Sequence, residues 1–507
     1  MKNIIKYTTV LLLTGVLLFT SCTEYLDVNT DPNNPTEVSP NLVLPVAQKY
    51  TANMIEGSDA GGRRMNTIGN MMMYNWSQSD GFAWYPDEFK YLVTSSFYQY
   101  VFDNSYTNAL KQYTVLEDLD AKYDYYKAIA MIMKAYHFQL LVDFYGDIPY
   151  SDALQRGGNS TPKYDDAKTI YEDLIVKLTE AISLIDNIAD IHETPSTDDV
   201  MFGGDMDKWK QFANSVKLRI LTRQMSMSGR STYIQTQFNA IATEGSGFLT
   251  EDAAVNPGYI EGEEGKQNPF FNLYGNDAGG TQTLTSKATC ATDYILDYLT
   301  STADTRIDFI YEKPTTGHLG VKQGLLDYDT PVPDAYVPEL VSNIGPGLLK
   351  SGSQGAVIYT LAECYLNQAE AALNGYIGDI PKVLYEDGVK ASFEYLCVNE
   401  DISIDSAMVL ANNYLSSTID NVGYDASTNK LEAIITQKWI ATNGITAEQS
   451  WFDYNRTGFP SNLPISDLAS TTDRPVRLYY TASEISSNGA NVPTQPNAFT
   501  GKIFWAK

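Results

Sequence analysis

The chain has 507 residues with 62 acidic and 35 basic side chains, which gives a formal net charge of −27 at pH 7. This excess of negative charge argues against binding to nucleic acid and to anionic lipid surfaces. After Cys22 three cysteines remain, Cys290, Cys364 and Cys397, and an odd number cannot pair fully within one chain. We therefore expect a fold that does not depend on disulfides, in which Cys364 is a buried free thiol.

The first residues predict export and attachment to lipid. Two lysines precede an apolar run at residues 10–19, which is shorter than the roughly 20 residues that span a bilayer and has the length of a signal-peptide core. Two small polar residues then lead into Cys22, where a bacterial lipoprotein is cut and acylated. The alternative is an ordinary signal peptide, but no A-x-A cleavage site follows. We predict a signal peptide at residues 1–21, lipid on Cys22, a flexible tether at residues 22–40, and a single domain at residues 41–507.

Residues 74–91, YNWSQSDGFAWYPDEFKY, gather seven aromatic side chains around the turn formers Asp80 and Gly81. Aromatic faces suit sugar rings, and binding pockets are mainly apolar with a few placed polar groups. We name Trp76, Asp80, Trp84 and Tyr85 as candidate ligand contacts. The alternative is that Trp76 and Trp84 fill the core between helices, and the sequence leaves both interpretations open.

Helical periodicity dominates the rest of the chain, because apolar residues recur at spacings of three and four. It predicts closely spaced helix pairs, which short connections force to be antiparallel. The pairs resemble tetratricopeptide units, although long insertions between them make a regular solenoid improbable. The predicted pairs cover residues 87–119 with 124–145, 353–374 with 379–396, and 428–443 with 446–456, and single helices are expected near 170–185 and 209–220.

Two segments, residues 245–280 and 329–355, break this pattern with glycine and proline but carry aromatic residues, which favours ordered loops. Within the first segment Phe270, Phe271 and Tyr274 form a second candidate ligand site. The alternative is a hydrophobic pin that anchors the loop. The nearby acidic residues at 261, 263 and 264 lack the alternating pattern of a calcium loop, so a solvated acidic loop is favoured.

No catalytic constellation is apparent. The three histidines, His137, His192 and His318, are far apart and have no metal-ligand spacing. The nucleophile, zinc and phosphate motifs G-x-S-x-G, H-E-x-x-H and G-x-x-x-x-G-K-[ST] do not occur. We expect no catalytic residue, no metal and no cofactor, with a glycosidase carboxylate pair as the remaining enzymatic alternative.

Six stretches, in order along nearly the whole chain, resemble the SusD/RagB family of surface lipoproteins. Two departures are visible: Thr481 stands where the family usually has proline, and Asn455 stands where the first of two arginines is common. The six stretches are EYLDVNTDPNNPTEVSP (24–40), DFYGDIPYSDAL (143–154), WKQFANSVKLRILTR (209–223), AECYLNQAEAAL (362–373), IITQKWIATNGITAEQSWFDYNRTGFP (434–460) and RLYYTASEISSNGANV (477–492).

The resemblance implies an all-α, mainly helical body with about four tetratricopeptide-like hairpins and irregular loop insertions. It also implies nutrient capture at the outer-membrane surface and delivery to a SusC-like TonB-dependent transporter. Family members mostly bind glycans and some bind peptides, so the implied ligand is an oligosaccharide, with a peptide as the alternative.

Overall fold

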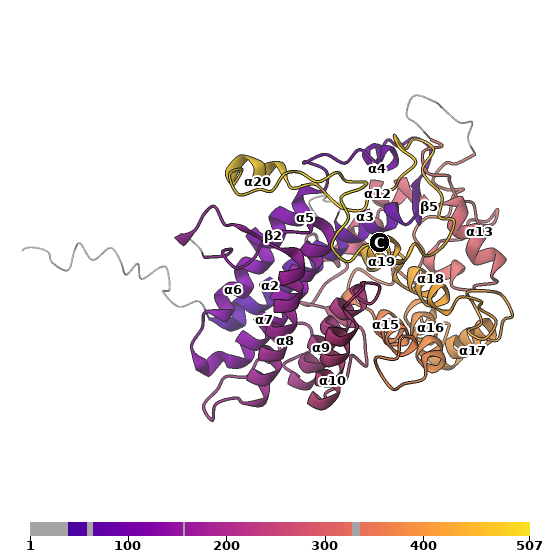
Figure 1. Ribbon diagram of the computed structural model, residues 1–507. Coiled ribbons are helices and arrows are strands. Elements are labelled where there is room, and N and C mark those ends of the chain that lie inside the picture. The colour runs from indigo at the N-terminus through magenta and orange to yellow at the C-terminus, as the bar shows by residue number, and fades with distance from the viewer. Residues whose placement is uncertain (1–38, 58–63, 156–157, 327–334) are drawn as a thin grey trace, which may run out of the picture.

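The computed structural model describes residues 39–57, 64–155, 158–326 and 335–507. About 49% of the chain is helical and the strands are few and short, so the predicted helical fold class is confirmed. Figure 1 shows the helices of the N-terminal half packed beside a second group from the C-terminal half. Cys22 and most of the predicted tether lie outside the described residues, so the division of residues 1–40 stays a prediction.

The N-terminal group is built from antiparallel neighbours, in which α6 packs on α7, α7 on α8, and α8 on α9. The predicted helix over 87–119 is wrong as one element, because Tyr91 and Tyr98 adopt the left-handed conformation and separate α4 from α5. The helices are α2 (Pro40–Glu56), α3 (Met65–Met72), α4 (Pro86–Lys90), α5 (Gln99–Asn104), the π-helix η1 (Ser105–Leu110), α6 (Lys111–Glu117), the 3-10 helix η2 (Ala121–Tyr123), α7 (Asp124–Tyr145), α8 (Ala167–Asp186), α9 (Met206–Arg223) and α10 (Ser231–Glu244).

The C-terminal group confirms the two predicted hairpins, α15 with α16 and α18 with α19. Helix α15 begins later than the expected residue 353, because the strand β6 occupies residues 356–359 and the Thr360 side chain caps the helix by accepting the Glu363 N–H. The helices are α15 (Leu361–Leu373), α16 (Pro381–Cys397), α17 (Ile404–Leu415), α18 (Lys430–Thr442), α19 (Ala447–Thr457) and α20 (Ala482–Ser487).

Among the described residues, three two-stranded antiparallel sheets connect distant segments of the chain. Each pairs segments from different parts of the chain: β1 (Trp76–Gln78) with β5 (Thr289–Ala291), β2 (Ile148–Pro149) with β3 (Tyr164–Asp165), and β4 (Ala253–Val255) with β6 (Ala356–Tyr359). The glycine-rich segment and the residues after it form the short helices α11 (Pro269–Tyr274), α12 (Leu284–Ala288), α13 (Asp293–Ser301) and α14 (Ile307–Ile310). The first predicted loop, residues 245–280, therefore contains strand β4 and helix α11, whereas residues 329–334 of the second loop lie outside the described residues.

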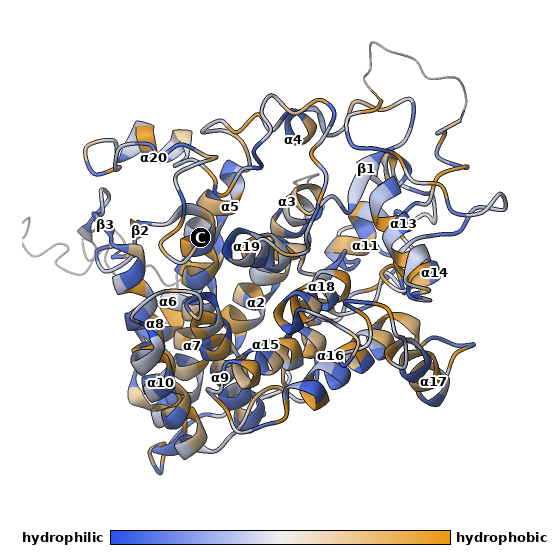
Figure 2. Cartoon of the chain, turned by 45° about the vertical axis from the view of Figure 1, so that its right-hand side comes forward, coloured by the Kyte–Doolittle hydropathy of each residue, from blue (hydrophilic) through white to orange (hydrophobic). Residues whose placement is uncertain are grey.

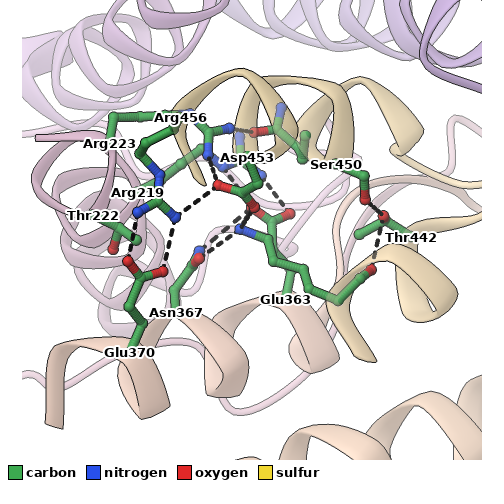
Figure 3. Close-up of polar contacts among 12 residues, drawn as sticks. Arg219, Thr222, Arg223, Glu363, Asn367, Glu370, Thr442, Ser450, Asp453 and Arg456 are labelled. Carbon is green, nitrogen blue, oxygen red and sulfur yellow. Dashed lines mark hydrogen bonds and ion pairs between the residues drawn. The ribbon is translucent and has the colours of Figure 1, made fainter. Parts of the chain in front are cut away.

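A buried cluster of charged side chains holds the two helical groups together (Figure 3). Arg219 of α9 forms a two-pronged pair with Glu363 of α15, with both hydrogen bonds at 2.8 Å. Asp453 of α19 lies 2.5 Å from Arg223 of α9 and 2.7 Å from Lys438 of α18. Buried charges are tolerated only when paired and hydrogen-bonded, so these contacts fix the relative positions of the four helices. We call this group, with Asp143, Glu370 and Arg456, the ion cluster.

The predicted free thiol is confirmed, because Cys364 is buried and unpaired, as are Cys290 and Cys397. Within the described ranges, no helix combines the length and the apolar character that a bilayer crossing requires.

Candidate functional site

A tight loop follows strand β1 and leads into α4. Gly81 has a φ of +85° with open space around it, so the Asp80–Gly81 pair turns the chain as the sequence predicts. Gln78 closes the loop: its Oε1 accepts the Trp84 N–H at 3.0 Å, and its Nε2 donates to the Leu326 carbonyl at 2.9 Å. The Asp80 N–H donates to the Tyr336 carbonyl at 2.8 Å. The tip is thus held from both sides by segments some 250 residues away in the sequence.

Phe82 and Trp84 present partly exposed rings at this tip. Their centroids lie 5.9 Å apart with the planes nearly perpendicular, at 86°. The carboxylate of Asp80 is half-buried beside them and accepts the Gly81 N–H at 2.9 Å. We call Asp80, Phe82 and Trp84 the aromatic tip. It combines apolar ring faces with a hydrogen-bond acceptor, which is the combination that a sugar or a peptide side chain requires.

The two candidate groups from the sequence meet inside the core. Trp76 is fully buried, with its ring 6.4 Å from that of Phe270 and 4.9 Å from that of Tyr274. The Tyr274 hydroxyl is 2.7 Å from the Thr67 hydroxyl, and Phe271 is also buried. The rings of Trp76, Phe270, Phe271 and Tyr274 are therefore packed in the core, as the alternative interpretation of these residues describes.

Tyr85 is likewise buried, and its hydroxyl lies 2.6 Å from that of Thr289 on the partner strand β5. Of the residues named from the sequence, Trp84 and Asp80 alone present surface to solvent. Their contact with a ligand stays a prediction, to which the structure adds the neighbouring ring of Phe82.

Several ionisable groups of the two candidate regions are buried or paired. Burial raises the pKa of Tyr74, whose hydroxyl accepts the Gln323 N–H at 3.2 Å. The Tyr98 hydroxyl donates to Glu88 Oε1 at 3.0 Å. In the glycine-rich loop, Glu263 pairs with Lys266 at 2.6 Å. Within the described part of the chain, no group of three or more His, Cys, Asp or Glu side chains is placed to hold a metal ion.

A family model described as "Starch-binding associating with outer membrane" matches residues 32–481. The chain belongs to the SusD-like family. The motifs from which the resemblance was drawn therefore point to the correct family, and four of them supply the paired side chains of the ion cluster.

Solved SusD-like structures share this fold over almost the whole chain. A SusD homologue from Bacteroides fragilis is 21% identical with a TM-score of 0.70, covering 92% of this chain and 99% of its own. A chitin-binding SusD homologue from Flavobacterium johnsoniae is 20% identical with a TM-score of 0.71, covering 91% of this chain and 98% of its own. A further chitin-binding protein is 24% identical with a TM-score of 0.71, covering 92% and 100%. Among curated proteins, no sequence matches this chain.

Proposed function

We propose that this SusD-like chain is a cell-surface lipoprotein that captures oligosaccharides at the aromatic tip. It is anchored in the outer membrane through lipid on Cys22, faces the cell exterior and delivers its ligand to a SusC-like TonB-dependent transporter. The observation that supports the capture step best is the partly exposed pair of rings at Phe82 and Trp84, on a loop whose backbone is held by hydrogen bonds.

The rigidity of the tip favours binding. A loop that must be ordered by its ligand costs conformational entropy and lowers affinity. Here Gln78, the Tyr336 carbonyl and the buried Trp76 already hold the backbone. The Trp84 ring can therefore serve as a preformed surface on which the C–H face of a sugar packs.

Chito-oligosaccharides are the first ligands to titrate, because two proteins of similar fold are described as chitin-binding. We expect heat on calorimetric titration of the mature chain with at least one glycan of a panel that includes them. Trp84→Ala should weaken that binding by about 30-fold, because an anchoring aromatic residue contributes about 2 kcal/mol or more.

Two matched variants complete the experiment. Tyr100→Ala removes an exposed aromatic ring outside the tip and should leave the affinity unchanged. Trp76→Ala should lower the stability of the fold by about 3–5 kcal/mol, because it empties a buried site. Unchanged glycan affinity in a folded Trp84→Ala variant would show that the ligand binds elsewhere.

The same titration decides between the two ligand classes. Heat with peptides and none with any glycan would favour the alternative, a peptide-capturing member of the family, for which the net charge of −27 suits basic peptides. Release of products from a labelled polysaccharide would favour a secreted glycoside hydrolase instead.

A further inference from the structure

A cavity lies away from the aromatic tip. It has a volume of about 790 Å³, within the range of ligand sites. Helices α5, η1 and α6 form its floor, the turn after β2 forms one wall, and α20 lines one end. Figures 1 and 2 both show α20 close to α5. We call this cavity the α5–α20 groove.

One face of a continuous helical stretch forms the floor of the groove. Phe102, Tyr106, Lys111 and Val115 follow one another at spacings of four or five residues, and the π-helix turns Tyr106 and Thr107 towards the cavity. Such π turns occur frequently at functional sites. The rings of Phe102 and Tyr106 lie 4.8 Å apart, and Leu154 lines the opposite wall. The interior is therefore mainly apolar.

The charges of the groove are separated along its length. At the α20 end, Asp103 Oδ1 accepts the Ser483 hydroxyl at 2.5 Å, which brings Asp103 close to the next residue, Glu484. Glu484 Oε2 accepts the Tyr164 hydroxyl at 2.9 Å and the Asn488 amide at 3.1 Å. Burial raises the pKa of Tyr106, and the nearby Glu484 charge raises it further. Two carboxylates therefore converge at one end of the groove.

Lys111 lines the same groove eight residues after Asp103. An α-helix rises about 1.5 Å per residue and the intervening π-helix rises less, so the backbone positions of the two residues are about 12 Å apart at most along the axis. Among the described residues, neither Lys111 nor the two carboxylates has an ion-pair partner, and Asp103 Oδ2 and Glu484 Oε1 accept no hydrogen bond. Each charge is thus available to a ligand.

We propose that the α5–α20 groove is a second binding site, which takes a short peptide with free termini. Its ammonium group lies against Asp103 and Glu484, its carboxylate pairs with Lys111, and its apolar side chains rest on the wall formed by Phe102, Tyr106 and Leu154. An extended chain covers about 3.3–3.6 Å per residue, so a span of about 12 Å selects three or four residues. A neutral oligosaccharide would leave the charges at both ends of the groove without a counter-charge.

The test is a calorimetric titration of the mature chain with the tetrapeptide Ala-Leu-Phe-Ala. We expect saturable binding of the peptide with free termini, and about tenfold weaker binding when the N-terminus is acetylated or the C-terminus amidated, because each cap removes one charge-assisted contact. Equal affinity for free and capped peptides, or no heat at millimolar peptide, would overturn the proposal.

The variant Lys111→Gln tests whether the peptide binds in the groove. Lys111 is exposed, so the variant should fold normally. It should lower the affinity for the peptide with free termini by about tenfold and leave the affinity for the C-terminally amidated peptide unchanged. Asp103→Asn should lower the affinity for the peptide with free termini by a similar factor and leave the affinity for the N-terminally acetylated peptide unchanged. Lys49→Gln, an exposed lysine outside the groove, is the matched control.

Variants of the aromatic tip distinguish peptide binding in the groove from glycan binding at the tip. Trp84→Ala should leave peptide binding unchanged, and Lys111→Gln should leave glycan binding unchanged. Peptide affinity that falls with Trp84→Ala but not with Lys111→Gln would place the peptide at the tip and refute the second site. A chain that binds the free peptide but no glycan would refute the glycan proposal alone.

Discussion

Replacing Asp453 by asparagine tests how the ion cluster holds the helices. Asp453 is fully buried and lies 2.5 Å from Arg223, 2.7 Å from Lys438 and 3.0 Å from Arg456. Burial alone would raise the pKa of its carboxyl group, but the attraction of Lys438, Arg223 and Arg456 outweighs burial and holds the pKa well below its usual value. The carboxylate is therefore charged wherever the protein is folded near neutral pH.

The cluster is balanced, because it holds four cations and four carboxylates. These are Arg219, Arg223, Lys438 and Arg456, with Asp143, Glu363, Glu370 and Asp453. Asp453→Asn keeps the shape of the side chain and leaves one cation uncompensated in a dry site. Breaking a buried pair in this way costs about 3–5 kcal/mol of unfolding free energy.

Urea unfolding measures this loss, with Glu180→Gln as the control. Glu180 pairs with Lys177 at 2.9 Å on the surface, where a pair contributes about 0–1 kcal/mol. Adding Lys438→Gln to Asp453→Asn should restore part of the loss, because the second change removes an unpaired cation. If Asp453→Asn costs no more than Glu180→Gln, the cluster does not hold the helices and the reasoning fails.

The stability difference between the parent chain and Asp453→Asn should depend on pH, because the pKa of the Asp453 carboxyl group is lowered in the folded chain. The unfolded carboxyl group titrates near the ordinary value of 3.8, and the folded one titrates lower. The stability that the charge contributes is therefore fully present above that value and is lost as the pH falls through the folded pKa. The gap between the parent chain and Asp453→Asn should be constant from pH 8 to pH 5 and narrow in stronger acid.

Two further predictions concern a buried acid and the lipid anchor. Burial raises the pKa of Glu56 to about 8, although its carboxylate accepts hydrogen bonds from Asn268 and the Val357 N–H. The folded chain therefore keeps a proton that the unfolded chain releases above about 4.5, so this group lowers stability by about 1.4 kcal/mol per pH unit between those values. Glu56→Gln should remove that slope in unfolding measured at pH 5.5 and 7.5, and an unchanged slope would contradict the assignment. Cys22→Ala should move the protein from the membrane to the soluble fraction, whereas retention in the membrane would contradict lipidation at this residue.

The helices were largely predictable, because apolar spacing and short connections are local properties of the sequence. The pairs α15 with α16 and α18 with α19 follow directly from them. The break between α4 and α5 was not predictable, since it depends on Tyr91 and Tyr98 in the left-handed conformation, which bulky side chains rarely adopt.

The burial of individual aromatic residues could not be predicted, because distant contacts decide it. Trp76 and Trp84 stand in the same short segment, yet β1 pairs with β5 more than 200 residues later and draws Trp76 into the core. The α5–α20 groove has the same origin: Asp103 and Glu484 are brought together by packing of segments that no local pattern links. The sequence offers only the isolated Lys111 and an aromatic helix face, which do not reveal a cavity.

The buried aromatic residues affect ligand binding indirectly, because they position the strand that carries the aromatic tip. Trp76 offers no surface to a ligand, yet its contacts with Phe270 and Tyr274 fix the strand from which the tip projects. Because Gln78 on the same strand accepts the Trp84 N–H, a shift of β1 would carry the exposed ring with it. The affinity of the tip therefore depends on core packing as well as on the rings that touch the ligand, since a displaced surface must be reordered at the expense of binding free energy.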